Sequence, residues 1–453
     1  MFPIRFRQQM QQMAKFFRRC GGEHGNVSVL FAFATFVLVL ASGVAVDFGR
    51  LTVARTSLSA AADAAVLQVG SSSLEKQGEM LSLAGVAMQQ NFDQAEHGEL
   101  VRLNLDYKDS VIILSATARF KTSFMSMVGI PSVDVPVSAE VTRSGNNIEV
   151  SLVLDATGSM KGARIAALKI AAKDFINAVV WEKQTLFYSK AAIVPYSMGV
   201  NVGALADIVR GTVAGGTCSA PGCQFYRFRN QFRNNKSFAV STCVSERIGQ
   251  EAYTDASALT YPVGFNYPSP NNPCIQHELI PLTANRTRLA ALIDQLDGSG
   301  STASQVGVAW GWYVLSRDFG IWSGENLPAA YGTKDVKKIT VIMTDGEFNS
   351  SYCKGVIAKS STHGSGADED KIDCNAPNGS AISQVQKLCD AMKKKGIVIY
   401  TVGFDIEKLE IVKQTLTDCA TSPSNAYLAA TSDQLSTAFR EIGRKVTGMR
   451  LSK

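Results

Sequence analysis

The feature that most constrains this chain is an uncharged apolar run of twenty residues near its start. Residues 27–46 read VSVLFAFATFVLVLASGVAV and contain no acidic or basic side chain. Twenty helical residues extend about 30 Å, which is roughly the thickness of the hydrocarbon layer of a bilayer. The run is apolar on all sides, whereas a helix on the surface of a soluble domain has one polar face. It therefore predicts a transmembrane helix over 27–46.

A cleaved signal peptide is the alternative interpretation of this run. Gly43, Val44 and Ala45 are small residues of the kind that a signal peptidase requires. Against this, the apolar run is longer than the usual apolar part of a signal peptide, and the basic region before it is long. We therefore favour an uncleaved anchor.

The positive charge of the chain is concentrated before the apolar run. The 453 residues carry a net charge of +6. Residues 1–26 contribute +4 of it, from five basic side chains and one acidic one, and the rest carries only +2. A basic flank of this kind predicts that residues 1–26 form a cytoplasmic tail and that the chain after residue 46 lies outside. A short basic tail does not describe a nucleic-acid-binding domain, so we expect no nucleic-acid partner.

Cysteine usage agrees with an exported body. One cysteine, Cys20, lies in the tail, and the remaining eight all follow the apolar run. An even number of cysteines in an oxidising compartment predicts disulfides. A metal site is the weaker alternative, because there is no CxxC pair and the chain has only four histidines. The eight candidates, paired as neighbours along the chain, are Cys218 with Cys223, Cys243 with Cys274, Cys353 with Cys374, and Cys389 with Cys419.

Residues 47–145 are expected to form a small unit of helix and sheet. The Ala-rich segment from Asp47 to about Phe92 predicts a helix that continues the membrane helix outward. Three segments then alternate between apolar and polar residues, at about 101–107, 114–120 and 133–141, as strands with one buried face do. Pro136 in the third segment indicates an edge strand or a bulge.

Residues 146–447 have the pattern of an α/β domain. Nearly continuous apolar segments predict strands buried on both faces at 148–154, 190–195, 338–343 and 397–402. Helices are expected at 163–180, 283–296, 303–318, 382–395 and 432–446, the second of them capped by Thr283 or Asn285. This alternation predicts a doubly wound, mainly parallel sheet. Two long insertions, at about 197–282 and 349–380, interrupt it and hold six of the eight exported cysteines.

Acidic and hydroxyl side chains follow two of the predicted strands. The first strand leads into Asp155, Thr157 and Ser159, and a later strand leads into Asp345. Between them, Thr302 stands at the start of a predicted helix. In open α/β sheets, ligands bind at the carboxyl edge, and hard oxygen donors suit Mg²⁺. The five residues therefore predict a site for Mg²⁺, or for another divalent cation such as Ca²⁺ or Mn²⁺.

These motifs resemble those of the von Willebrand factor type A domain. The segments DATGSM at 155–160 and MTDGE at 343–347, with Thr302 between them, are similar to the metal-ion-dependent adhesion site of that family. The resemblance covers about 146–447. It implies direct coordination of the cation by Thr157, Ser159 and Thr302, with Asp155 and Asp345 acting through water. The family commonly has Ser at the position of Thr157, but the hydroxyl group is retained.

The N-terminal part resembles the TadE/TadG-like proteins of the tight-adherence (Flp) pilus system. The similar segments are GNVSVLFAF before and within the apolar run, AVDFGR at its end, and SLSAAADAA beyond it. TadG-like proteins join such an N-terminus to a type A domain. In related pseudopilins a prepilin peptidase cuts at a Gly that is followed five residues later by Glu. Here Leu30 stands five residues after Gly25, so we expect no such cleavage.

Together the pattern and the resemblance predict a non-enzymatic pilus assembly or adhesion protein. It would cross the bacterial inner membrane once, with its body in the periplasm or at the cell surface. Its partners would be other pilus assembly proteins, or a surface ligand that offers a carboxylate to the bound cation. Two alternatives remain: a Mg²⁺-dependent phosphoryl hydrolase with Asp155 as nucleophile, and a structural pseudopilin with an inert type A domain.

Overall fold

The computed structural model describes residues 26–72, 74, 76–108, 111–142, 146–182, 184 and 187–448. The basic tail up to residue 25, including Cys20, lies outside the described residues. The chain forms two compact units, residues 1–144 and 145–453.

The first unit begins with a long helix, α2 (Asn26–Ser71). Its segment Val27–Gly70 is long and apolar enough to cross a membrane, by length and composition. Side chains of the predicted span are exposed, among them Phe31 and Phe33. An apolar helix is thus present where the sequence predicts one, and it continues beyond Asp47 as expected.

The prediction of one helix from Asp47 to about Phe92 is wrong at its second half. After α2 the chain turns back into α3 (Gln77–Asn91) and the short α4 (Gln94–His97). The reversal lets Met80 and Met88 of α3 join a buried cluster with Leu58 of α2. A continuous helix would leave these apolar side chains in water, and burying them is favourable by roughly 1.5–3 kcal/mol each.

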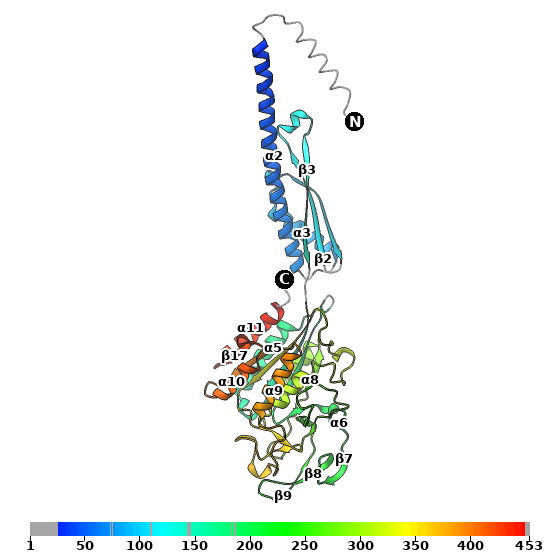
Figure 1. Ribbon diagram of the computed structural model, residues 1–453, viewed down its shortest axis with the longest axis vertical. Helices are drawn as coiled ribbons and strands as arrows, with labels where there is room; N and C mark the ends of the chain where they lie inside the picture. Colours follow the sequence, from blue (N-terminus) through cyan, green and yellow to red (C-terminus); the bar gives the residue numbers. More distant parts are fainter. Residues whose placement is uncertain are drawn as a thin grey trace. The chain divides into compact units, whose positions relative to one another are not determined.

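The sheet of the first unit covers this helix pair (Figure 1). Its strands β1 (Glu99–Lys108), β2 (Val111–Lys121) and β3 (Ser132–Thr142) are antiparallel and lie in that order. They coincide with the three alternating segments, and Pro136 lies on the edge strand β3, opposite Thr117. A single turn of 3₁₀ helix, η1 (Met125–Val128), stands between β2 and β3.

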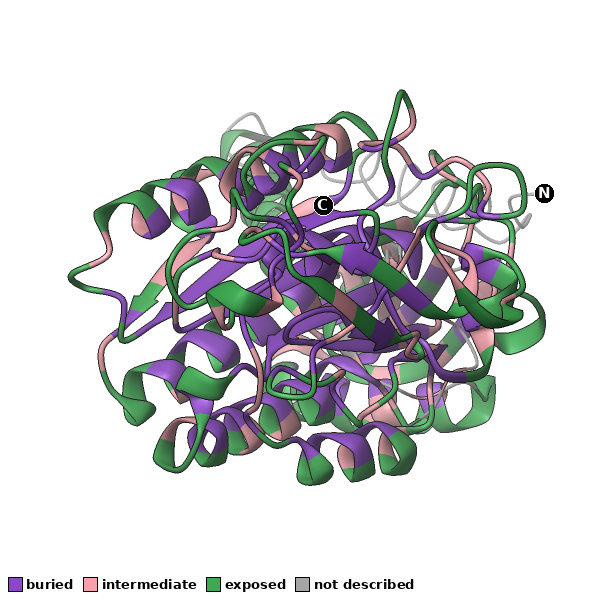
Figure 2. Ribbon diagram, turned by 90° about the horizontal axis from the view of Figure 1, so that it is seen from below, coloured by how far each residue is buried: buried purple, intermediate pink, exposed green. Residues whose placement is uncertain are grey.

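The second unit is built on a mixed six-stranded sheet, which confirms the expected mixture of helices and strands. Its order is β12 (Ile280–Thr283), β5 (Ser189–Tyr196), β4 (Asn147–Asp155), β13 (Val336–Thr344), β16 (Val398–Phe404) and β17 (Ala426–Ala429). The edge strand β12 is antiparallel to β5, and the other neighbours are parallel. Figure 2 shows the buried strands between helices whose outward sides are exposed.

Alternation along the strands separates two hydrophobic clusters. On one face, Val150 and Leu152 of β4 belong to a cluster with side chains of α5 (Ala163–Val179), α7 (Arg286–Gln295) and α11 (Ser432–Gly448). On the other face, Val153 belongs to a cluster with α8 (Ser304–Tyr313), α9 (Ala381–Lys394) and α10 (Glu410–Cys419). Adjacent strand residues point to opposite faces, so one short strand contributes to both clusters.

The element boundaries differ from expectation in three places. The sequence pattern missed the helix α10 and the strands β12 and β17, which have only four residues each. The helix expected over 283–296 begins at Arg286, because Thr283 still belongs to β12 and Asn285 caps the helix by accepting from the N–H of Arg288 at 2.9 Å. The helix expected over 303–318 ends at Tyr313.

The two insertions contain regular secondary structure. They contain the short strands β6 (Val200–Asn201), β7 (Ala214–Cys218), β8 (Cys223–Arg229), β9 (Asn235–Ala239), β10 (Cys243–Ser245), β11 (Gly264–Phe265), β14 (Tyr352–Cys353) and β15 (Val356–Ile357), and the helix α6 (Ala206–Arg210). Four disulfides tie the second unit: Cys218–Cys223, Cys243–Cys274, Cys353–Cys374 and Cys389–Cys419. The first three lie within the insertions, and the last joins α9 to α10.

Candidate functional site

Three neighbouring parallel strands end in acidic residues at one edge of the sheet. Asp155 is the last residue of β4, Asp345 follows β13 directly, and Asp405 follows β16 directly. Leu154 is paired with Met343, and Thr344 with Gly403, so the register places the three strand ends at the same level. The edge predicted from the sequence therefore exists, with a third acid that the sequence reasoning missed.

Asp155 is fully buried and both of its carboxylate oxygens accept hydrogen bonds. Oδ1 accepts from the backbone N–H of Thr157 at 2.9 Å and from its hydroxyl at 2.6 Å. Oδ2 accepts from the hydroxyls of Thr344 at 2.7 Å and Tyr196 at 3.1 Å. Asp155 thus organises the strand ends, and a buried carboxylate with four donors is poorly placed to attack a substrate.

A chain of hydroxyl groups connects the two predicted acids. The hydroxyls of Thr157 and Ser159 are 2.9 Å apart, and Ser159 donates to Oδ1 of Asp345 at 2.5 Å. Four of the five residues singled out from the sequence therefore form one continuous network: Asp155, Thr157, Ser159 and Asp345.

Thr302 is placed differently from the other four. Its backbone N–H donates to the side chain of Asn349 at 2.9 Å, and among the described residues its hydroxyl has no hydrogen-bond partner. The loop before it nevertheless packs on the loop after Asp155, because the N–H of Gly158 donates to the carbonyl of Gly300 at 2.9 Å. The structure brings the three predicted loops together, but it does not join Thr302 to the network directly.

Burial governs the charge of the two acids. It raises the pKa of Asp155, against the effect of the hydrogen bonds from Thr157, Thr344 and Tyr196. It also raises the pKa of Asp345 to about 6, and the negative charge of Asp155 adds to this rise. Hydrogen bonds from Ser159 and the charge of Arg164 oppose it. Two buried carboxylates connected in one network favour a nearby cation.

That cation is provided within the chain by Arg164, which the sequence reasoning also missed. Its guanidinium donates to Oδ2 of Asp345 at 3.0 Å and to the carboxylate of Asp405. Asp405 adopts a left-handed backbone conformation with φ of 53°, which few residues other than Gly, Asn and Asp accept. Position after a buried strand was the signal that could have identified Asp405; no sequence signal identifies Arg164.

The donor set suits a hard divalent cation. It combines two carboxylates with the hydroxyls of Thr157 and Ser159, all oxygen donors of the kind that Mg²⁺ and Ca²⁺ prefer. In the part of the chain that the structure describes, no group of three or more His, Cys, Asp or Glu side chains is arranged so that it could hold a metal ion. The residues therefore fit an oxygen-rich site with few charges, and do not fit a zinc site.

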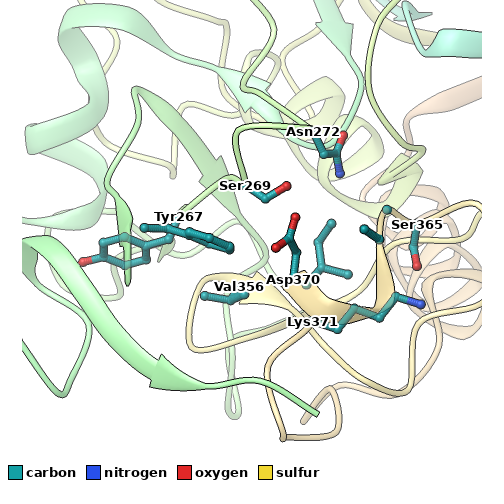
Figure 3. Close-up of a pocket in the computed structure, with 11 residues that line it drawn as sticks. Tyr267, Ser269, Asn272, Val356, Ser365, Asp370 and Lys371 are labelled. Atoms are coloured by element: carbon teal, nitrogen blue, oxygen red, sulfur yellow. The ribbon is translucent and has the colours of Figure 1, made fainter. Parts of the chain in front are cut away.

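Away from the candidate site, a small cavity lies among the insertions and is lined by side chains that include Ser269, Asn272 and Asp370 (Figure 3). Its volume is about 10 Å³. Oδ2 of Asp370 is buried there without a hydrogen-bond partner among the described residues. A cavity of this size holds about one water molecule, which is too little for an organic ligand.

Comparison with known proteins gives one family match. The family described as "Putative Flp pilus-assembly TadE/G-like" matches residues 25–72, which coincide with α2. No curated protein matches the chain.

Solved structures that resemble the chain include proteins of bacterial pili. The pilus adhesin SpaC from Lactobacillus rhamnosus GG has a TM-score of 0.37 and 12% identity, over 76% of this chain and 34% of SpaC. The vWF domain of the type V pili tip protein Mfa5 from Porphyromonas gingivalis has a TM-score of 0.39 and 12% identity, over 68% of this chain and 98% of that domain. The pilus adhesin RrgA from Streptococcus pneumoniae has a TM-score of 0.37 and 10% identity, over 76% of this chain and 48% of the RrgA chain. This chain thus spans about a third of SpaC, and similarity at this level does not transfer a function.

Proposed function

We propose that this chain is a membrane-anchored, non-enzymatic assembly or adhesion protein of a pilus system, which binds its partner through a divalent cation. The observation that carries the proposal is the hydrogen-bonded network of Asp155, Thr157, Ser159 and Asp345 at adjoining strand ends, which is buried except at Ser159. The match of residues 25–72 to a pilus-assembly family supports the cellular context. Its second unit would be a type A domain with a doubly wound sheet, in agreement with the order of its motifs.

The bound cation would supply the positive charge that a partner's carboxylate requires. Asp155, Thr157, Ser159, Thr302 and Asp345 would hold Mg²⁺, or Ca²⁺ or Mn²⁺ in its place. Thr302 has a hydroxyl available for this role, and Ser159 stands next to Asp345. The two carboxylates only balance the charge of a divalent cation and the other ligands are neutral, so an acidic side chain of a partner would complete its shell.

Catalysis is the less favoured function. The hydrolase alternative needs Asp155 as an accessible nucleophile, and Asp155 is fully buried with both oxygens engaged. We therefore propose binding, with other pilus components or a surface ligand as partners. The chain would be a single-pass protein of the inner membrane, with residues 1–26 in the cytoplasm and the second unit in the periplasm or at the cell surface.

Thermal unfolding of the full chain in detergent tests the cation site. A ligand that binds only the folded state stabilises it by RT ln(1 + [L]/Kd), about 2.7 kcal/mol at a hundredfold excess over Kd. We expect Mg²⁺ to raise the melting temperature of the second unit. Asp155→Asn, which keeps the shape of the side chain, should abolish the rise, and Thr302→Ala should reduce it.

The matched control is Asp390→Asn, on the exposed side of α9, which should leave the rise unchanged. If neither Mg²⁺, Ca²⁺ nor Mn²⁺ shifts the melting temperature of the unaltered chain, the five residues serve only as caps and turns. The second unit would then be an inert domain of a structural pseudopilin.

A further inference from the structure

The segment that joins β2 to β3 is a compact, uncharged tip. Residues 122–131, the hairpin tip, read TSFMSMVGIP. Hydrogen bonds within the tip hold its two ends together. The N–H of Thr122 donates to the carbonyl of Pro131 at 3.2 Å, and the N–H of Ile130 donates to the carbonyl of Met125 at 3.0 Å. The N–H of Gly129 donates to Ser126 at 3.1 Å. Many backbone groups of the tip therefore have hydrogen-bond partners within the protein and do not need water.

A buried acid of α2 fastens the hairpin tip. The carboxylate of Asp47 accepts from the backbone N–H groups of Ser123 at 3.1 Å, Phe124 at 2.7 Å and Met125 at 2.8 Å, and it is not exposed. Arg50, one turn further along α2, donates to the hydroxyl of Ser123 at 3.2 Å. The polar groups of the junction are thus paired within the first unit.

Phe124 lies directly on the apolar run of α2. A Cβ atom at Gly43 would stand 2.4 Å from Cδ1 of Phe124, so only glycine allows this approach. Phe124 and the helix residues Leu38, Val39 and Val46 line part of an open groove of about 360 Å³. Gly43 lies inside the uncharged segment 27–46, about 4.5 Å along the helix from residue 46. The tip therefore reaches the level of the predicted span.

The outer surface of the hairpin tip is apolar. Met127 is 74% exposed, Val128 50% and Ile130 42%. Exposure of these side chains to water is unfavourable, and the transfer of each one into an apolar phase lowers the free energy. At the depth of Gly43, a chain anchored by α2 is surrounded by lipid.

We infer that the hairpin tip inserts into the bilayer beside α2, with lipid acyl chains filling the groove below Phe124. The partner is the leaflet at the Asp47 end of the span. Backbone enters this zone at low cost only when its polar groups are paired within the protein, as most N–H groups of the tip are. The tip and the helix would then hold the first unit against the membrane at two points.

This inference goes beyond the proposed function, since it concerns the lipid surface and not the cation site. It does rest on α2 as the membrane anchor. A protein partner on the same apolar surface is the competing occupant, and the experiment distinguishes the two.

Photocrosslinking in membranes tests the inference on the full chain. A photoreactive amino acid replaces Met127, or replaces Ile113 in the control variant. Ile113 is 37% exposed in β2 and pairs with Asp106 and Glu140, eight residues from the end of that strand. We expect phospholipid adducts at position 127 in at least about tenfold excess over position 113, as partition of an apolar side chain into lipid implies.

Alkaline extraction of the same membranes reports the anchor separately. If the chain stays in the membrane but position 127 gives no lipid adduct, or adducts only with another protein, the inference is wrong. If the chain is extracted, the anchor and the inference both fail. The Mg²⁺-dependent melting of the second unit is independent of either outcome.

Discussion

At the scale of single residues, Arg164 determines the charge balance of the candidate site. It is the cation that contacts both Asp345 and Asp405. A divalent cation at Asp345 would have to compete with it, because both require the same carboxylate. The arginine would therefore stabilise the metal-free fold and oppose the proposed metal binding.

Replacing Arg164 should separate these two effects. We expect Arg164→Ala to lower the stability of the metal-free chain by about 1–2 kcal/mol, because Arg164 is partly exposed and solvent screens its ion pairs. The same change should tighten Mg²⁺ binding. Denaturant unfolding without metal and calorimetric titration with Mg²⁺ measure the two. Weaker Mg²⁺ binding in the variant would show that Arg164 supports the site and does not compete for it.

The raised pKa of Asp345 predicts a pH dependence. Its pKa of about 6 in the folded chain lies above its ordinary value of 3.8. The folded state therefore binds this proton more tightly, so the stabilisation is complete below about pH 4 and is lost as the pH rises through 6. A metal requires the carboxylate, so Mg²⁺ affinity should fall about tenfold per pH unit below pH 6.

Mg²⁺ titrations at pH 7.5 and pH 5 check this prediction. The metal-free melting temperature, measured at both values, shows whether the second unit remains folded at the lower pH. Equal Mg²⁺ affinity at the two pH values would mean that Asp345 does not bind the cation.

At the scale of elements, the sheet contains a buried ion pair away from the candidate site. Nζ of Lys338 on β13 lies 2.5 Å from Oε2 of Glu149 on β4, and both side chains are almost fully buried. Oε1 of Glu149 accepts further hydrogen bonds from Tyr188 at 3.0 Å and from the N–H of Ala329 at 2.8 Å. The pair joins the two central strands at the end opposite Asp155.

Breaking this pair on one side should be costly. Lys338→Met leaves the Glu149 carboxylate buried without its cation, and we expect a loss of about 3–5 kcal/mol. Adding Glu149→Gln to that variant should recover part of the loss, since the amide oxygen still accepts from Tyr188 or Ala329. Denaturant unfolding of the single and double variants gives the coupling energy. If the double variant is less stable than Lys338→Met, the loss in Lys338→Met is not caused by the buried, unpaired charge of Glu149.

Close packing of α8 on the sheet offers a second test at this scale. A Cβ atom at Gly311 would stand 2.4 Å from Cγ2 of Val153, in the buried core of the sheet. We expect Gly311→Ala to destabilise the second unit by about 1–3 kcal/mol through overpacking. Gly85→Ala in α3 is the control, because its Cβ would have only Leu103 near it, at 3.9 Å, and alanine favours helix. A stability loss for the control but not for Gly311→Ala would contradict this packing.

The elements that could be predicted from the sequence are those whose own residues carry a clear period. The three alternating segments have such a period, the four buried strands are marked by nearly continuous apolar runs, and the structure contains a strand at each. The break between α2 and α3 has a local signal that the sequence reasoning missed, because Gly70 is followed by consecutive serines, whereas the contact of Met80 and Met88 with Leu58 has none. The positions of Asp155 and Asp345 after two strands correctly predicted that they lie at one edge of the sheet. The same reasoning cannot predict that Arg164, which lies on the helix α5, directs its side chain to Asp345.

At the scale of the whole molecule, the disulfides should contribute unequally to stability. Cys218–Cys223 closes a loop of 5 residues, whereas Cys389–Cys419 closes one of 30. In the chain-entropy description the longer loop restricts the unfolded chain more, by about 3.6 kcal/mol against about 2 kcal/mol. Replacing both cysteines of each pair by serine, followed by denaturant unfolding, compares them. A larger loss for Cys218–Cys223 would contradict the loop-length argument.

The disulfides also connect the fold to the direction of the chain across the membrane. Four disulfides persist only in an oxidising compartment, whereas the cytosol keeps thiols reduced. The net charge of +4 before the apolar run favours the cytoplasm for the tail. Both arguments give the same orientation, so thiol labelling of the denatured chain from intact cells should find Cys20 free and the other eight cysteines oxidised.

A reporter enzyme that is active only after export should be active when fused after Lys453. Replacing the five basic residues of the tail by glutamine should lower that activity, because it removes the charge that retains the tail inside. An inactive reporter on an intact, membrane-bound chain, with most of the eight cysteines free, would reverse the orientation.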